Sequence, residues 1–160
     1  MKIKKYIFIV ILLMGVCGMV NMVYPDKTIH ASAEQKIGDS DYGVMYIYPD
    51  TVEAVKKNDR YYVIVSAEDH YTDEKFLAQL RQGENMQNAV STLCLYMFTN
   101  DGRFYCMVQR YLIDNEGKVC ADLGSDMQFR AIDEKILTGV YTAALKVLED
   151  KKRFQSMMER

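Results

Sequence analysis

The sequence predicts an α+β domain: a mainly antiparallel sheet of about five to six strands, with an inserted helix and a C-terminal helix packed on one face. Three observations predict this class. Short runs of aromatic and β-branched residues recur along the chain, an Asp-Gly pair separates two of them, and a helical apolar pattern closes the chain. An antiparallel sheet of this kind can leave its second face in contact with solvent.

The first 33 residues have the layout of a secretory signal peptide. Three lysines precede an apolar run over residues 6–23, and small residues end the leader at Ala33, after which we expect cleavage. The apolar run also approaches the roughly 17–25 residues of a membrane span, so an uncleaved anchor is an alternative. Cys17 suggests a lipoprotein, although Val16 stands where a small residue is expected. Each alternative predicts an extracytoplasmic domain: periplasmic, at the cell surface or secreted. We expect the protein to contact the membrane only if the leader is not cleaved, and then only through the leader.

Residues 34–160 suit one domain with one core, since 127 residues remain after the leader. Four of the 20 basic and one of the 22 acidic side chains lie in the leader, which leaves 16 basic, 21 acidic and a net charge of −5. Nucleic-acid backbones are bound by clustered Lys and Arg, so we expect no nucleic-acid partner. Residues 34–42 are predicted to be a flexible N-terminus, 43–154 the α+β domain and 155–160 a tail.

Three strands are predicted in the first half of the domain. Aromatic and β-branched residues fill residues 43–48, 51–55 and 60–67. A Pro-Asp pair and an Asn-Asp pair separate these runs, and both pairs are typical of turns.

Acidic residues around His70 raise the question of a catalytic or metal site. Glu68, Asp69, Asp73 and Glu74 lie within four residues of this imidazole. A catalytic zinc usually has three protein ligands, often with more than one His, and the sequence contains no H-x-x-x-H or Cys/His set. We therefore expect no metal, no cofactor and no catalytic residue in this stretch.

The same stretch has the features of a helix start. Phe76, Leu77 and Leu80 have helical spacing, and Thr72 is a good N-cap. Acidic side chains in a first turn complement the positive end of a helix. We therefore predict a helix over residues 74–83. The preceding acids and the imidazole then lie in a strand-to-helix loop.

The clearest local signal is a β-hairpin. Two apolar runs, residues 91–98 and 103–113, flank an Asp-Gly turn at 101–102. The turn fixes the expected register, because residues equally distant from it lie opposite each other. The expected pairs are Met97 with Cys106, Leu95 with Val108, and Cys94 with Gln109.

Three cysteines follow the leader, Cys94, Cys106 and Cys120. In the expected register Cys94 lies ~10 Å along the strand from the partner of Cys106, too far for a disulfide. An odd number of cysteines in an exported domain leaves one thiol free or paired between chains. A homodimer is therefore one alternative that the sequence leaves open.

The chain is predicted to end with two strands and a helix. A turn at 114–117 precedes strands over 118–123 and 127–132, and Asp133 is a suitable helix cap. Apolar residues then recur at helical spacing, and we expect this stripe to pack on the sheet. The stripe consists of Ile136, Leu137, Val140, Tyr141, Ala144, Leu145 and Leu148.

Ten tyrosines and no tryptophan follow the leader, and most of these tyrosines fall in predicted strands. Tyr combines a large contact area with a polar tip, which suits either amphipathic cover on a half-exposed sheet or a binding face. Because Tyr61 and Tyr62 are adjacent, they must point to opposite faces of the sheet. The strand tyrosines are Tyr46, Tyr48, Tyr61, Tyr62, Tyr96, Tyr105 and Tyr111.

The leader, the stretch YGVMYIYPDTVEAVKKNDRYYVIV, the hairpin LYMFTNDGRFYCMVQRYLIDNEGK and the closing helix resemble the surface-adhesin protein E family of small exported bacterial proteins. The shared pattern spans residues 43–148. The resemblance implies a surface-exposed, non-enzymatic binding domain directed at host extracellular proteins. That family closes its C-terminal helix with a disulfide, and this helix contains no Cys. No motif here carries binding residues over from the family.

These observations favour an exported binding module, adhesin-like and not an enzyme, with a protein partner. The alternative is an envelope assembly or structural partner that uses an edge strand or an intermolecular cysteine. A small secreted enzyme has less support, because acid–base or nucleophilic catalysis needs two or three groups converging in a pocket. A thiol paired with His70 is the arrangement that would favour an enzyme.

Overall fold

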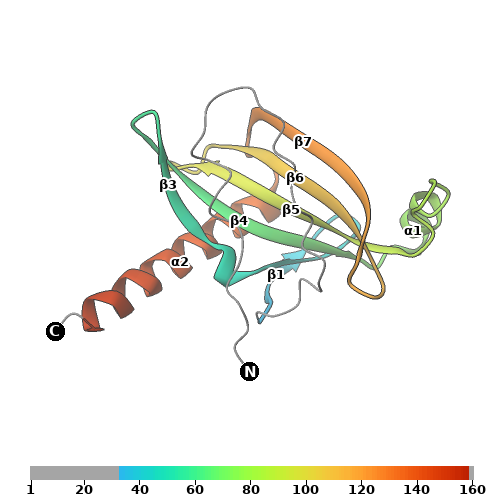
Figure 1. The fold of residues 1–160 in the computed structure, drawn as a ribbon, viewed down its shortest axis with the longest axis horizontal. Helices are drawn as coiled ribbons and strands as arrows, with labels where there is room; N and C mark the ends of the chain where they lie inside the picture. The colour runs from blue at the N-terminus through green and yellow to red at the C-terminus, as the bar shows by residue number, and fades with distance from the viewer. Residues whose placement is uncertain (1–32, 159–160) are drawn as a thin grey trace.

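The computed structural model describes residues 33–158, and this part of the chain forms a single antiparallel sheet with two helices (Figure 1). The sheet has the order β1-β2-β4-β5-β6-β7, and β3 pairs with β4 beside β2. The predicted α+β class is confirmed, with one inserted and one C-terminal helix, but the sheet has seven strands rather than five to six. The strands are β1 (Gln35–Asp39), β2 (Gly43–Ile47), β3 (Glu53–Lys57), β4 (Arg60–Tyr71), β5 (Ala89–Thr99), β6 (Phe104–Asp114) and β7 (Val119–Ala131); the helices are α1 (Glu74–Leu80) and α2 (Lys135–Met158).

Strand β1 lies where we predicted a flexible N-terminus at residues 34–42. It pairs antiparallel with β2, from Gln35 opposite Ile47 to Asp39 opposite Val44. The prediction was wrong because β1 is an edge strand, whose polar side chains hide the usual apolar signal. Ile37 nevertheless packs against the core.

The last strand, β7, is continuous where we predicted two strands at 118–123 and 127–132. Gly124 has a left-handed φ of 72°, and the pairing of β6 with β7 shifts register on both sides of it. Glycine adopts this conformation without steric cost, so the strand bends there without ending.

The β5–β6 hairpin confirms the predicted turn and part of the predicted register. Gly102 has a φ of 65°, and Met97 lies opposite Cys106. A bulge at Val108 of β6, opposite Leu95 and Tyr96, then displaces the rest of the strand by one residue. The expected pairs beyond it were therefore wrong: Leu95 lies opposite Gln109 and Cys94 opposite Arg110. Cys94, Cys106 and Cys120 are free thiols.

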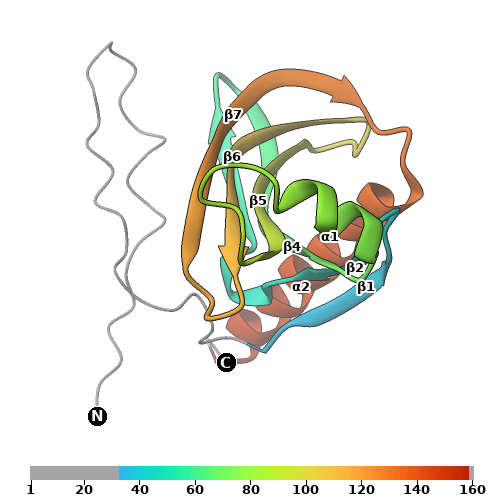
Figure 2. The ribbon, with the colours of Figure 1, turned by 90° about the vertical axis from the view of Figure 1, so that its right-hand side faces the viewer.

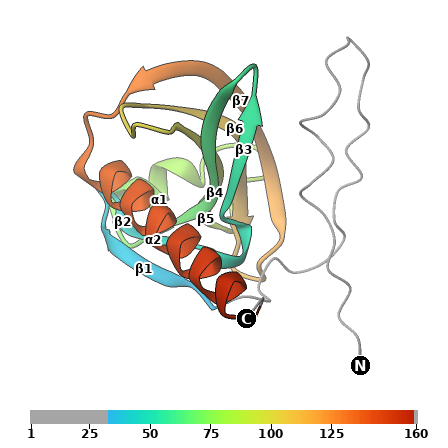
Figure 3. The ribbon, with the colours of Figure 1, turned by 90° about the vertical axis from the view of Figure 1, so that its left-hand side faces the viewer.

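Helix α2 lies along one face of the curved sheet, as predicted (Figures 2 and 3). It contacts β1, β2 and β4, and Leu137, Val140 and Ala144 are buried against the sheet. The helix runs to Met158, past the expected end of the domain at 154, so part of the predicted tail is helical. Before this extension, Lys151 Nζ donates to the Val52 carbonyl at 2.8 Å.

Strand β4 runs to Tyr71, and this corrects the interpretation of the acidic stretch as a loop. Glu68, Asp69 and His70 are strand residues paired with both β2 and β5. Helix α1 begins later, and its N-cap is Asp73 rather than Thr72. The Asp73 carboxylate accepts from the backbone N–H groups of Lys75 and Phe76 at 2.8 and 2.9 Å.

The predictions on the leader concern residues 1–32, which lie outside the described part of the chain, and Ala33, the first described residue. Within the described residues, neither helix combines the length and the apolar character needed to cross a membrane.

Candidate functional site

The alternation of side chains along β4 divides the acidic stretch between the two faces of the sheet. Asp69 and Tyr71 point to the same face as Val65, which is part of the core beneath α2. Glu68 and His70 point to the opposite face. Residues adjacent in sequence therefore lie on different faces of the sheet.

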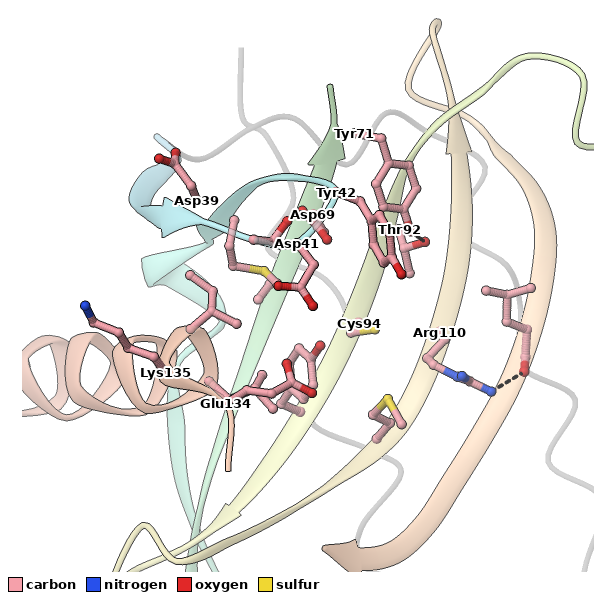
Figure 4. A pocket seen from close by; sticks show the side chains of 18 residues that line it. Asp39, Asp41, Tyr42, Asp69, Tyr71, Thr92, Cys94, Arg110, Glu134 and Lys135 are labelled. Carbon is pink, nitrogen blue, oxygen red and sulfur yellow. Dashed lines mark hydrogen bonds between the residues drawn. The ribbon is translucent and has the colours of Figure 1, made fainter. Parts of the chain in front are cut away.

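A cavity of about 520 Å³ lies on the α2 face (Figure 4). It is bounded by the β1–β2 turn, by the start of α2 and by strands β2 and β4–β7. Its floor is largely apolar because central strand positions supply Met45, Ala67, Cys94 and Met107. Polar side chains stand around this floor, as in many ligand-binding pockets.

One end of the cavity carries two carboxylates, Asp41 and Asp69. The Asp69 carboxylate accepts a hydrogen bond from Ser40 Oγ at 2.6 Å, and Ser40 Oγ in turn accepts from the Gly43 backbone N–H at 2.9 Å. Burial raises the pKa of Asp69, the hydrogen bond from Ser40 offsets part of that rise, and the neighbouring charge of Asp41 adds to it. This end of the cavity therefore has a negative potential that favours cations.

Aromatic rings stand beside these carboxylates. Tyr42 stacks on Phe76 of α1 with ring centroids 4.2 Å apart, and Tyr71 meets the same ring edge-on at 4.7 Å. Tyr71 also shares a short hydrogen bond with Thr92. Burial raises the pKa of Tyr71 to about 12, so its phenol is neutral at physiological pH. Both tyrosines line the cavity, and the packing with α1 fixes their orientation.

The opposite end of the cavity carries Arg110 of β6. Its Nη2 donates to the Leu123 carbonyl at 3.0 Å, as Figure 4 shows. Its Nε is buried without an acceptor, and among the described residues no carboxylate lies within ion-pair distance of the guanidinium. Arg110 therefore brings an uncompensated positive charge to the cavity.

Cys94 lies on the floor close to Arg110, and its thiol is a candidate nucleophile. Burial raises the pKa of Cys94 to about 11, although the positive charge of Arg110 counteracts part of the rise. A thiol with this pKa is almost wholly protonated at neutral pH and is a poor nucleophile. The floor therefore offers a surface for contact rather than a reactive group.

A closed polar cluster lies on the other face, centred on Glu68, which is only 2% exposed. Its carboxylate accepts from Ser91 Oγ at 2.5 Å and from the Tyr48 hydroxyl. His70 Nε2 lies 3.2 Å from Glu68 Oε1, at ion-pair distance but without the direction of a hydrogen bond. We name these four residues, Tyr48, Glu68, His70 and Ser91, the Glu68 cluster.

The pKa values of the Glu68 cluster follow from these contacts. Burial alone would raise the pKa of Glu68, but His70, Ser91 and Tyr48 more than offset it and hold the value at about 2. Proximity to Glu68 raises the pKa of His70, against the opposing effect of burial. Burial and the neighbouring carboxylate raise the pKa of Tyr48 well above its ordinary value. The cluster is therefore an anion held by neutral hydroxyls and a histidine.

The structure does not bring His70 together with Cys94 or Cys106. Cys94 faces the cavity, whereas His70 lies on the opposite face. Cys106 shares the face of His70 but lies opposite Met97 of β5, which in turn lies opposite Ile64 of β4. Ile64 is six residues from His70 along β4, so Cys106 and His70 are ~20 Å apart along the strand direction. Within residues 33–158, no three His, Cys, Asp or Glu side chains are grouped so that they could hold a metal ion.

The strand tyrosines do not form one exposed face. Tyr48, Tyr96 and Tyr105 are buried, whereas Tyr61 is 55% exposed. Tyr62 is half-buried, as expected for a neighbour of Tyr61 that points to the other face. The tyrosines that line the cavity near its acidic end, Tyr42 and Tyr71, were not among the predicted strand tyrosines.

Sequence reasoning missed the cavity because its residues come from distant parts of the chain. The alternation of β4, had it been continued to Tyr71, would have placed Asp69 and Tyr71 on the core face. Nothing local identifies Arg110 as their neighbour, since a bulge at Val108 of β6, opposite Leu95 and Tyr96, decides its register. No protein-family model, curated protein or solved structure matches this chain.

Proposed function

We propose that this protein is an exported, non-enzymatic binding module whose ligand occupies the cavity beneath the start of α2. The observation that carries the proposal is the cavity itself, about 520 Å³ with an apolar floor and a few polar groups around it. Ligand pockets typically enclose ~300–1,000 Å³ and have this composition. The secretory layout of the leader supports export.

The chemistry of the cavity supports binding rather than catalysis. Its thiol is protonated, its phenol Tyr71 is neutral, and the histidine lies on the other face of the sheet. General acid–base catalysis needs groups that titrate near the working pH and converge on one reacting atom. The resemblance to the surface-adhesin protein E family also supports a binding role, with a host extracellular protein as the partner that presents the bound group.

The proposal is tested by NMR of the ¹⁵N-labelled protein with a mixed set of small fragments: fatty acids, alkylamines, amino acids, aromatic acids and sugars. We expect shifts that cluster at Ala67, Cys94 and Met107. The variant Met107→Trp fills the cavity and should abolish these shifts while thermal unfolding shows that it remains folded. Shifts confined to other parts of the surface, or equal shifts in the filled variant, would exclude the cavity as the binding site.

A second candidate function is assembly with another copy of this chain through β7. This strand of 13 residues pairs only with β6 among the described strands, so its outer edge is available for β-augmentation. Val119, Met127 and Phe129 are exposed on it, and the half-buried Cys120 lies in the same strand. A neighbouring copy at this edge would bring two Cys120 thiols into the same interface.

Intact mass and size in solution, measured with and without reductant, test assembly. The edge interface is supported if the wild type is a dimer that responds to reductant, if the Cys120→Ser variant no longer responds, and if Gln128→Pro dissociates the dimer. A monomer under both conditions, at concentrations well above those in the envelope, rules it out. The same mass measurement shows whether the chain begins at Glu34.

A further inference from the structure

We infer that the cavity binds a small zwitterion: a molecule with a protonated amine at one end, a carboxylate at the other and a short apolar chain between them. The inference rests on the proposed function and names the ligand class for the same site. It comes from three features of the cavity: an acidic aromatic end, an apolar floor and a single guanidinium at the far end (Figure 4).

The acidic end fits an ammonium group. Asp41 and Asp69 have no ion-pair partner among the described residues, and Asp69 already has its one hydroxyl donor in Ser40. Tyr42 and Tyr71 add ring surfaces beside these carboxylates, and aromatic rings attract cations through their π-electrons. A carboxylate with a flanking ring is the common arrangement for binding an amine.

The far end fits a carboxylate. Arg110 donates one N–H group to the Leu123 carbonyl, and the rest of its guanidinium has no anionic partner among the described residues. Guanidinium groups bind carboxylates through charge-assisted hydrogen bonds, about twice as strong as neutral ones. The two charged ends are therefore complementary to opposite ends of one molecule.

The spacing of the strands sets the length of the ligand. Asp69 lies opposite Thr92, and Arg110 lies opposite Cys94, two residues further along β5. Two strand spacings and two residues place the Cα atoms of Asp69 and Arg110 ~12 Å apart. The Arg110 side chain leans toward Leu123 of β7, away from Asp69 (Figure 4), so the charged ends stay apart by about this distance, and the matching molecule has a chain of several methylene groups lying over the floor.

The remaining charges around the cavity do not change this preference. Glu134, just before α2, points into the cavity, whereas the side chain of its neighbour Lys135 points away from it (Figure 4), and among the described residues no ion pair joins the two. Asp39 is an exposed residue at the end of β1 and forms an ion pair with Lys36 at 3.3 Å. The charged groups without an ion-pair partner are thus Asp41 and Asp69 at one end, Arg110 at the other, and Glu134, which adds a further negative charge.

The experiment is a titration of the ¹⁵N-labelled protein with ω-amino carboxylates of increasing chain length, beginning with β-alanine. The n-alkylamine and the n-alkyl carboxylate of equal length serve as matched probes. We expect the affinity to pass through a maximum at one chain length and to exceed that of either matched probe at least about tenfold, the equivalent of ~1.4 kcal/mol.

Two variants assign the ends. Asp69→Asn keeps the acceptor for Ser40 and removes the charge, so it should weaken binding of the amines and the ω-amino carboxylates alike. Arg110→Met should abolish the advantage of the ω-amino carboxylate over the plain amine. The control is Asp59→Asn, the same charge change at an exposed turn residue whose φ of 59° asparagine tolerates; it should bind like the wild type.

The outcomes separate this inference from the proposed function. If fragments shift the cavity signals but ω-amino carboxylates bind no better than their matched probes, the zwitterion is excluded and the binding cavity stands. If the cavity signals respond to no probe, both proposals are wrong. If either charge variant unfolds, the chain-length maximum and the matched probes still decide the ligand class in the wild type.

Discussion

The two faces of the sheet differ in the kind of residue that they bury. The α2 face buries apolar side chains around Phe98 and Val140 and keeps an open cavity at one end. The opposite face carries two small apolar clusters, one around Tyr48 and Leu93 and one around Met97, and also buries a carboxylate. The residues that resemble catalytic groups, Glu68 and His70, belong to the second face.

This difference shows that chemically conspicuous residues need not mark the functional site. The Glu68 carboxylate accepts from Ser91 and Tyr48, and His70 Nε2 lies at ion-pair distance from it, so the negative charge is balanced within the Glu68 cluster. Arg110, by contrast, carries a charge that the described residues leave uncompensated. A charged group without a charged partner inside the fold is available to a ligand, and Arg110 is such a group in the cavity.

The largest expected effect tests the α2 face as the main source of stability. Phe98 is fully buried, and Phe98→Ala should lower the free energy of unfolding by about 3–5 kcal/mol, because it removes a large apolar side chain and leaves a void. Urea denaturation measures this change. The matched control, Phe104→Ala, alters a phenylalanine that is 43% exposed and should change stability much less. Equal losses in both variants would mean that the α2 face is not the dominant core.

An intermediate effect is expected for the buried carboxylate. Glu68→Gln replaces an acceptor by an amide that cannot satisfy all of its donors, and should cost about 1–3 kcal/mol near neutral pH. The unfolded carboxyl titrates near 4.5 and the folded one near 2. The wild type should therefore keep this stability above pH 4.5 and lose it as the pH falls toward 2.

Urea denaturation as a function of pH measures both parts of this prediction. The variant should show a smaller loss of stability than the wild type between pH 4.5 and 2, and Glu116→Gln, an exposed turn acid, should behave like the wild type. An unchanged acid profile in Glu68→Gln would show that the cluster is not held by an ionised carboxylate.

The smallest effect concerns His70, whose folded pKa lies above the ordinary value of 6.5. The contribution of His70 to the free energy of unfolding is complete below pH 6.5 and is lost as the pH rises through the folded pKa. We expect the change to stay below about 1 kcal/mol, because the imidazole is partly exposed and solvent screens its interaction with Glu68.

NMR titration of the imidazole gives the folded pKa of His70 directly, since no other histidine follows the leader. His70→Asn should remove the corresponding slope from the stability profile above pH 6.5. A pKa at or below 6.5 would mean that His70 does not pair with Glu68 and is not part of the Glu68 cluster.

Much of the fold was readable in the sequence where the signal is local. The Asp-Gly pair at 101–102 predicted the hairpin, and the four-residue recurrence through Val140 and Ala144 predicted the face of α2. The edge strand β1 and the last residues of β4 escaped prediction because their side chains are mostly polar. Their strand conformation comes from backbone pairing with neighbours.

The sequence by itself determined the α+β class, the hairpin turn and the helix faces, because turn residues and apolar periodicity act over a few neighbouring residues. Only the tertiary structure decided the candidate site. A bulge at Val108 of β6, opposite Leu95 and Tyr96, sets Arg110 opposite Cys94, and alternation along β4 sends Asp69 to the cavity and Glu68 to the other face. Register and facing depend on pairing between distant strands, and no short stretch of sequence contains that information.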